Sequence, residues 1–578
     1  MSTVMHNDLT IIDNGEGDEP VRERSTAPLF ASVLEARLDR RQLLKGSAGA
    51  AAIGFMGLGL AGCNSGSDSD DNDGTPPPAA ALLGFSAVPV NSLDVITVPE
   101  GYSHQVLIPW GTPITGDFPT FSVNSTGADQ ASQVGSHHDG MHFFPINDSS
   151  VDGLLVLNHE YIEPRLMHAR AQGVALSGGA VPPLVAGKRP ADEVLKEMNA
   201  HGVSIVRVVQ GANKEWQVQP DALNRRITAL TPMAIQGPVR GTDFVKTKYS
   251  PNGTMTRGTL NNCGNGYTPW GTYMAAEENW AGYFSNSGDN PREHAAYGIP
   301  TGSNGRYGWE SADSGADEYI RFDASIKGAS AIEDYRNEPV CFGWMVEIDP
   351  FDPDSTPVKR TAMGRFGHEG VVFAPAVEGR PVVCYSGDDS QFEYIYKFVS
   401  ATNYNSATAS GSLLDTGTLY VAKFNADGTG EWLPLVFGQN GLTPANSFTS
   451  QADVLVNTRT AADLLGATPM DRPEWGAVDP ANGDVYFTLT NNSRRTAAQT
   501  DEANPRAGNP HGHIIRWAET GGDHAATTFD WDIFLFAGTS GEFGSAPSVG
   551  QDPKGEQLTA DNILSSPDGM WIDPDSRV

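Results

Sequence analysis

Acidic side chains recur in this sequence at positions where a short apolar strand meets a loop. Each of them alone has an ordinary interpretation, because Asp-Gly pairs usually form turns and neighbouring acids are usually solvated. Five such clusters in one chain favour another interpretation, in which oxygen ligands converge on a site for several metal ions. The candidate ligands in these clusters are Asn158, Glu160, Glu369, Asp388, Glu474 and Asp568.

A cysteine joins these acids. Cys263 lies in a glycine-rich stretch that leads to Glu278, and the chain contains no CxxC spacing, which argues against a zinc ribbon. Taken alone, Cys263 is more simply a buried structural thiol. Cys341 and Cys384 could form a disulfide in an oxidising compartment, and Cys263 would then be left as a thiolate ligand.

The composition is that of a folded, acidic protein. Of its 578 residues, 39% are hydrophobic and 9% aromatic, and 38 Lys and Arg against 70 Asp and Glu give a formal net charge of −32. A surface this acidic repels phosphate backbones, so we expect no nucleic-acid binding. The 64 glycines and 39 prolines indicate many turns between short strands rather than disorder or a helix bundle.

Residues 1–62 read as a targeting region. The segment 39–45, DRRQLLK, carries a twin-arginine pair, and the apolar run 46–60 after it is too short to span a bilayer. The following Ala-Gly-Cys predicts lipid attachment at Cys63; cleavage by an ordinary peptidase, with Cys63 incidental, is the alternative. We therefore expect the twin-arginine translocation machinery to export the folded protein to the periplasm or the cell exterior, with or without a lipid anchor.

A flexible linker, 63–81, precedes the folded region 82–578. This region is predicted to be all-β, with one short helix near 191–200. The expected strands cover 154–157, 203–208, 344–348, 418–422 and 484–488.

A repeated phrase indicates a β-propeller. Trp475 to Pro480, WGAVDP, is followed by a tight turn and a second strand, and Met570 to Pro574, MWIDP, begins the same phrase again. A strand, a turn and a partner strand form the repeating unit of a propeller blade. Because the sequence ends at Val578, we expect the C-terminal blade to be truncated.

Several ordered phrases allow a comparison with a known family. They include TVPEGY at 97–102, NNC at 261–263, TPWGT at 268–272, EEN at 277–279, GWMVEIDP at 343–350, GRFGHE at 364–369, YSGDD at 385–389, YKFV at 396–399 and RPEW at 472–475. Through these phrases the chain, from about Gly84 to its end, resembles the bacterial PhoX-type alkaline phosphatases. The resemblance implies a six-bladed β-propeller with loop insertions that holds iron and calcium in its channel.

The resemblance also implies roles for individual residues. Cys263, Glu278 and Glu369 correspond to Fe3+ ligands, and Asp388, Glu474 and Asp568 to Ca2+ or bridging ligands. Arg472 corresponds to the phosphate-binding arginine, and Asn158 to Glu160 to the channel segment of the first blade. The implied reaction is hydrolysis of small phosphomonoesters by a metal-bridging oxide or hydroxide, in a protein expected to be a monomer.

The spacing of Arg472 and Glu474 makes a local prediction. Two residues apart in an extended segment, their side chains share one face, and Pro473 between them restricts the backbone. We expect Glu474 to reach a metal and Arg472 to reach the substrate beside it. The alternative is a structural salt bridge of Arg472 with Asp471 or Glu474.

Two other functional classes stay open at this point. A calcium-dependent propeller hydrolase of the lactonase or phosphotriesterase type would use calcium and no cysteine. A non-catalytic exported propeller would bind a partner or carbohydrate, and its acids would be structural. Convergence of Cys263 with Glu278 and Glu369 would argue against both, because neither class needs a thiolate beside two carboxylates.

Overall fold

The structure is a computed structural model that describes residues 85–86, 88–89, 91, 93–114, 122–171, 181–538 and 563–573. The expected targeting region 1–62, with Cys63, and the linker 63–81 lie outside the described residues. The chain forms two compact units, one containing Val106–Ala537 and the segment from Leu564, the other containing Pro28–Gln105 and Gly538–Ile563. In the second unit, the described residues form turns and irregular segments.

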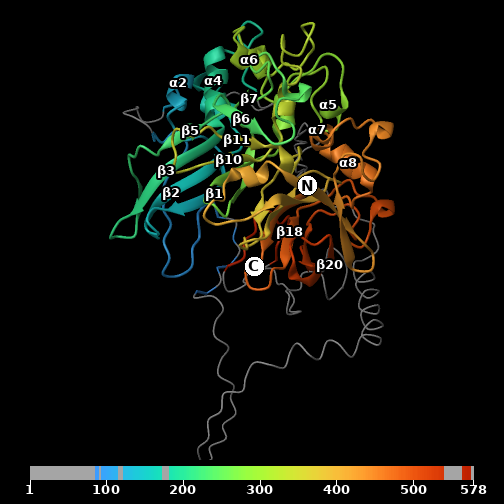
Figure 1. Ribbon diagram of the computed structural model, residues 1–578. Coiled ribbons are helices and arrows are strands. Elements are labelled where there is room, and N and C mark those ends of the chain that lie inside the picture. Colours follow the sequence, from blue (N-terminus) through green and yellow to red (C-terminus); the bar gives the residue numbers. More distant parts are fainter. Residues whose placement is uncertain are drawn as a thin grey trace, which may run out of the picture. The chain divides into compact units, whose positions relative to one another are not determined.

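The first unit is mostly β (Figure 1). Its first sheet has the strand order β1-β2-β3-β4, and β5 also pairs with β3, all antiparallel. Both faces of β2 and β3 carry buried apolar residues, which is why these two strands have almost no exposed positions. The strands are β1 (His138–Pro145), β2 (Asp152–His159), β3 (Gly202–Gln210), β4 (Trp216–Val218) and β5 (Arg225–Ile227).

The second sheet has the order β7-β6-β11-β10-β9-β8, and its β6–β11 pair is parallel. Its strands are β6 (Pro232–Gln236), β7 (Met255–Arg257), β8 (Asn262–Tyr267), β9 (Tyr273–Glu277), β10 (Val346–Ile348) and β11 (Val358–Arg360). Together with the first sheet it encloses an apolar core that contains Val156, Ile205, Met233 and Tyr273.

The third sheet, drawn in yellow to red in Figure 1, has the order β12-β13-β14-β15-β16-β20-β19-β18-β17. Every pair in it is antiparallel, and the β16–β20 pair joins two runs of strands. Its strands are β12 (Val372–Phe373), β13 (Pro381–Gly387), β14 (Ile395–Asn403), β15 (Gly417–Phe424), β16 (Thr429–Pro434), β17 (Pro473–Val478), β18 (Val485–Leu489), β19 (His513–Glu519) and β20 (Thr528–Phe536).

Helices are few and lie in the connections. Among the described residues, the longest α-helix is α4 (Ala191–Ala200), followed by α8 (Thr458–Leu465) and α7 (Gln451–Val456). The others are single turns, namely α2 (Gly127–Gln130), α3 (Pro164–Met167), α5 (Arg292–Ala295) and α6 (Asp317–Ile320). Among the described residues, no helix is both long enough and apolar enough to cross a membrane.

The edge strands of the three sheets meet one another. β1 contacts β8, β8 contacts β12, and β12 contacts β17. Each of these four strands ends its sheet or its run of strands, as the innermost strand of a propeller blade does. The meeting edges define the place where side chains from distant parts of the sequence come together.

Most of the expected elements are confirmed. The helix at 191–200 has the expected bounds, and β2, β3, β15 and β18 cover four of the five expected strands. The fifth, β10, begins only at Val346, because the backbone N–H groups of Gly343 and Trp344 donate to the Glu277 carboxylate instead of to a neighbouring strand. The WGAVDP phrase forms the antiparallel pair β17–β18, but Met570 to Asp573 form no strand.

The suggested disulfide between Cys341 and Cys384 is wrong, since both thiols are free and buried. Cys341 lies in the 3-10 turn Glu338–Cys341 and Cys384 in β13, where each is packed as a small apolar side chain. Burial raises the pKa of Cys341 to about 12 and that of Cys384 further, so neither forms a thiolate at neutral pH.

Candidate metal centre

Seven side chains with potential ligand atoms form one continuous group, which we call the acidic cluster. It consists of three sets, and within each set the ligand atoms lie within 4.8 Å of one another. Neighbouring sets share Cys263 and Glu369, so the three sets are joined. The sets are Asp139, Glu160 and Cys263; Cys263, Glu278 and Glu369; and Glu369, Glu474 and Asp568.

The meeting edge strands supply most of these residues. Asp139 lies on β1, Cys263 on β8 and Glu474 on β17, and Glu369 lies three residues before β12. Glu160 and Glu278 directly follow the adjacent strands β2 and β9. Asp568 lies in the segment 563–573, which is fastened to the third sheet because the Thr488 hydroxyl donates to its carbonyl at 2.9 Å.

Two glycines let these edges approach closely. A Cβ atom at Gly140 would lie 2.8 Å from the Cys263 carbonyl oxygen, and one at Gly264 would lie 2.2 Å from the Glu369 carbonyl oxygen. Both neighbours are backbone atoms that cannot rotate away. The backbone segments that carry Asp139, Cys263 and Glu369 are therefore in direct contact with one another.

The cluster concentrates negative charge, with Glu278, Glu369 and Glu474 buried, Asp139 and Glu160 half-buried and Asp568 exposed. Burial, followed by repulsion from neighbouring acids, raises the pKa values of Glu278, Glu369 and Glu474 well above the ordinary range. The same causes raise the pKa of Asp568 to about 6. One oxygen each of Glu278 and Glu369 is buried without a hydrogen-bond partner among the described residues.

The thiol of Cys263 lies among these carboxyl groups. Its Sγ lies 2.8 Å from Asp139 Oδ2 and 3.0 Å from Glu369 Oε1. Burial, then the nearby carboxylates, raises its pKa well above the usual value. Six carboxyl groups and a thiol packed this closely can all be ionised only when cations lie between them, and orphaned carboxylate oxygens provide ligand positions for such cations. The residues present thus fit a site for multivalent metal ions.

Arg472 borders the cluster. Its Nη2 lies 2.7 Å from Asp389 Oδ2 and 3.2 Å from Glu474 Oε1, and its Nε has no partner among the described residues. Of the two salt bridges named above as the alternative, the one with Glu474 is present, whereas Asp471 is bound by Arg495. The extended backbone expected here is wrong, because Arg472 has a φ of +55°. This left-handed conformation before Pro473 is unfavourable, and residues so constrained concentrate at functional sites.

The structure separates two neighbouring acids. Both Asp388 oxygens accept hydrogen bonds from Arg459, at 2.7 and 2.8 Å, and Asp388 is outside the three sets. Asp389 points toward the cluster, where Oδ2 meets Arg472 and Oδ1 is buried without a hydrogen-bond partner among the described residues. Like Asp388, Asp389 is outside the three sets; it borders the cluster through its ion pair with Arg472.

A family model for alkaline phosphatase PhoX matches residues 83–578. The chain belongs to the PhoX alkaline phosphatase family. It is similar to the solved structure of Pseudomonas fluorescens PhoX in complex with vanadate, a transition state analogue, with 38% sequence identity and a TM-score of 0.75. That similarity covers 86% of this chain and 83% of that chain. No curated protein matches the chain.

Membership of the PhoX family decides the general function. The chain is a phosphatase that hydrolyses phosphomonoesters, and its substrates are small phosphate esters. The family is metal-dependent, in agreement with the donor set of the acidic cluster, and the mostly β fold is consistent with a propeller-type architecture.

Asn158 has a different place in this PhoX site from the one expected. Its Nδ2 lies 2.7 Å from the Cys263 carbonyl oxygen and 2.8 Å from that of Gly264, and its Oδ1 accepts from the Tyr273 hydroxyl at 2.9 Å. Two of these contacts hold the Cys263 strand β8, and the third is with β9, the strand paired with it. Asn158 thus orients a cluster residue rather than facing the cluster itself.

Sequence reasoning missed Asp139, Asp389 and Arg459. Asp139 carries the signal used for the other acids, since Asp139-Gly140 lies where a loop meets a strand. Nothing local distinguishes Asp389 from Asp388, and Arg459 lies on a helix about 70 residues further along the chain. Spatial proximity alone identifies these two.

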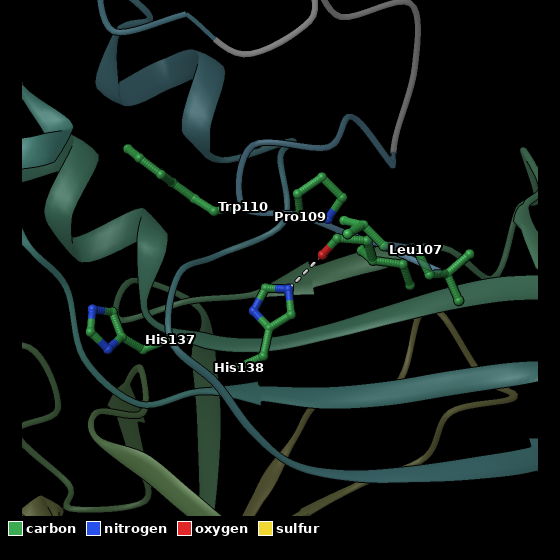
Figure 2. A pocket seen from close by; sticks show the side chains of 7 residues that line it. Leu107, Pro109, Trp110, His137 and His138 are labelled. Carbon is green, nitrogen blue, oxygen red and sulfur yellow. Dashed lines mark hydrogen bonds between the residues drawn. The ribbon is translucent and has the colours of Figure 1, made fainter. Parts of the chain in front are cut away.

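A pocket of about 400 Å³ lies near the start of β1 (Figure 2). Residues 106–110 and the rings of His137 and His138 line it, and the His138 Nε2 lies 2.6 Å from the Ile108 carbonyl oxygen. His137 and His138 precede Asp139, but no residue of the acidic cluster lines this pocket. We therefore assign it no part in the PhoX site.

Proposed function

We propose that this phosphatase binds Fe3+ and Ca2+ in the acidic cluster. Cys263, Glu278 and Glu369 form the iron set, since a thiolate among carboxylates suits ferric iron better than calcium. Glu474 and Asp568 form the calcium set, and Glu369 bridges the two. Asp139 and Glu160 bind on the other side of Cys263.

When bound, these ions supply the charge that a phosphate dianion needs and lower the pKa of water beside it. The protein's own residues hold the substrate. The Arg472 guanidinium is planar and matches phosphate oxygens, and its Nε donor is available next to Glu474. Asp389 holds Nη2, which orients the remaining donors.

One observation carries this proposal, namely that the three sets share Cys263 and Glu369. A calcium-dependent lactonase or phosphotriesterase type of site has no use for a thiolate, and a binding module has no use for orphaned buried carboxylate oxygens. The joined sets also offer ligands for more than one ion, as expected for a reaction that stabilises both an attacking and a leaving oxygen.

Metal content measured together with p-nitrophenyl phosphate turnover tests the proposal. We expect iron and calcium in the purified protein, loss of turnover in a calcium chelator and recovery with added calcium, because carboxylates hold calcium reversibly. Arg472→Lys should retain both metals and the melting temperature while turnover falls by about one to three decades. Calcium without iron would favour the lactonase type instead, and full turnover in metal-stripped protein would refute the metal assignment.

We also propose the cellular setting and the full architecture. The twin-arginine segment 39–45 supports export of the folded protein by the twin-arginine machinery to the periplasm or cell exterior, and Cys63 supports a lipid anchor. The meeting edge strands support a propeller, and the likeness to the PhoX family supports six blades; we expect the protein to act as a monomer. Radiolabelled palmitate incorporation, compared between wild type and Cys63→Ala, tests the anchor.

A further inference from the structure

One arginine outside the acidic cluster holds the turn that carries Asp388 and Asp389. Arg459, on α8, places Nε 2.8 Å from Asp388 Oδ2 and Nη2 2.7 Å from Asp388 Oδ1. Nη2 also lies 3.1 Å from the Ser390 Oγ. The pair is bidentate and Asp388 is fully buried, so its carboxylate has a fixed position and plane.

The turn connects in two directions. The Asp388 Oδ1 accepts from the Gly367 N–H at 3.1 Å and the Asp389 N–H donates to the Gly367 carbonyl at 3.0 Å, which ties the turn to the segment that leads to Glu369. On the other side, Asp389 Oδ2 binds Arg472. A shift of this turn would therefore move Arg472 relative to Glu369.

Arg459 is itself held rigidly. Its Nη1 donates to the Ala296 carbonyl at 3.2 Å, and its guanidinium lies 5.1 Å from the centre of the Tyr297 ring. The Tyr297 hydroxyl in turn donates to the carbonyls of Arg365 and Val456. Arg459 therefore fixes the 388–390 turn relative to the packed residues around Ala296 and Tyr297.

We propose that Arg459 is a positioning residue for the substrate-binding arginine. Through Asp388 it sets the direction of Asp389, and through Asp389 it sets the guanidinium of Arg472. A lysine could keep the charge but not the two parallel hydrogen bonds that fix the plane of Asp388. This inference rests on the phosphate-binding role proposed above for Arg472.

A double-mutant cycle tests it, with Arg459→Lys, Arg472→Lys and the double variant of the full chain. The measurements are iron and calcium per chain, melting temperature, kcat and KM for p-nitrophenyl phosphate, and the inhibition constant of vanadate. We expect Arg459→Lys to keep its metals and to weaken vanadate inhibition about 10- to 100-fold, the range known for residues that orient a first contact. The vanadate inhibition constant of the double variant should be within about twofold of that of Arg472→Lys, because both substitutions disturb the same series of contacts from Arg459 to Arg472.

Arg292→Lys is the matched control. Arg292 pairs with Asp453 of α7, next to α8, and among the described residues it forms no hydrogen bond or ion pair with the 388–390 turn. An equal loss of vanadate affinity in this variant would show that loosening the helical layer is sufficient and would overturn the proposal. The proposal would also be overturned if the losses of vanadate affinity in the two single variants multiplied in the double variant. An unchanged vanadate inhibition constant in Arg459→Lys would overturn it as well.

The two proposals fail in different ways. If Arg472→Lys leaves vanadate inhibition unchanged, the role of Arg472 is refuted and that of Arg459 with it. If Arg459→Lys alone leaves vanadate inhibition unchanged, only the positioning role of Arg459 is refuted. Should Arg459→Lys fail to fold, Ser390→Ala removes one contact of the same guanidinium; a rise of about two- to tenfold in the vanadate constant supports the proposal, and no change overturns it.

Discussion

Glu277 and Glu278 are neighbours in sequence, and both are buried at the end of β9. The Glu277 carboxylate accepts from Lys359 Nζ at 2.7 Å and from the N–H groups of Gly343 and Trp344. The Glu278 carboxylate accepts from the Asn279 amide on one oxygen, and its other oxygen has no hydrogen-bond partner in the described part of the chain.

Burial raises the pKa of both carboxyls, so the direction of the shift does not distinguish them. What distinguishes them is the partner. Glu277 has a lysine that neutralises it within the sheet, as Glu519 has Lys397 in the third sheet. Glu278 is surrounded by further acids. Among the described residues Glu278 forms no ion pair, and this lack of a neighbouring protein cation is what favours a metal ion beside it.

Replacing the thiol in the uncompensated region should have the largest effect. If Cys263 binds Fe3+, the wild type has a sulfur-to-iron absorption band, and Cys263→Ala loses both the band and turnover. We expect turnover to fall by more than about two decades, since even residues that only orient ligands are worth 10- to 100-fold. Cys341→Ala, at a buried thiol outside the acidic cluster, is the control and should keep colour and activity. A colourless wild type with full activity would make Cys263 a packing residue.

The two adjacent glutamates allow a direct test of the comparison. Glu277→Gln leaves Lys359 buried without its charge partner, so we expect a loss of about 3–5 kcal/mol in the free energy of unfolding and an unchanged metal content. Glu278→Gln removes a ligand and a repulsive charge, so metal content should fall while the metal-stripped protein melts at a higher temperature than stripped wild type. The same response in both variants would remove the distinction drawn here.

A smaller effect should appear in the pH dependence of the metal-stripped protein. A carboxyl whose folded pKa lies above its unfolded value binds more protons in the folded state, so stability falls as pH rises between the two values. For Asp568 this interval runs from about 4 to about 6, and for Glu278, Glu369 and Glu474 it extends higher. The melting temperature of stripped protein should decrease over this range, whereas bound cations should hold that of loaded protein nearly constant. Parallel curves would contradict the assignment.

Sequence patterns predicted the strands and the approximate place of the site, because both depend on local periodicity and on acids at strand ends. Glu160, Glu369, Glu474 and Asp568 come together as their positions at strand ends suggested, and Cys263 and Glu278 join them as the family resemblance implied. The Asp388–Asp389 pair shows where such reasoning stops. In a tight turn, adjacent side chains point in different directions, and the choice between them depends on Arg459, a partner from a distant helix. The left-handed backbone conformation of Arg472 could not be predicted either, because the sequence Asp-Arg-Pro-Glu contains no residue that favours it.

The glycines at 140 and 264 have a consequence for how the centre is filled. Where main chain rests on main chain, the dimensions of a cavity do not depend on which rotamers its lining adopts. The spacing of the segments that carry Asp139, Cys263 and Glu369 should therefore not depend on bound ions, so these ligands are in place before an ion enters. We expect the backbones of stripped and loaded protein to superpose, and loading to proceed without refolding. The protein could then fold first and bind its ions later, in whichever compartment supplies them.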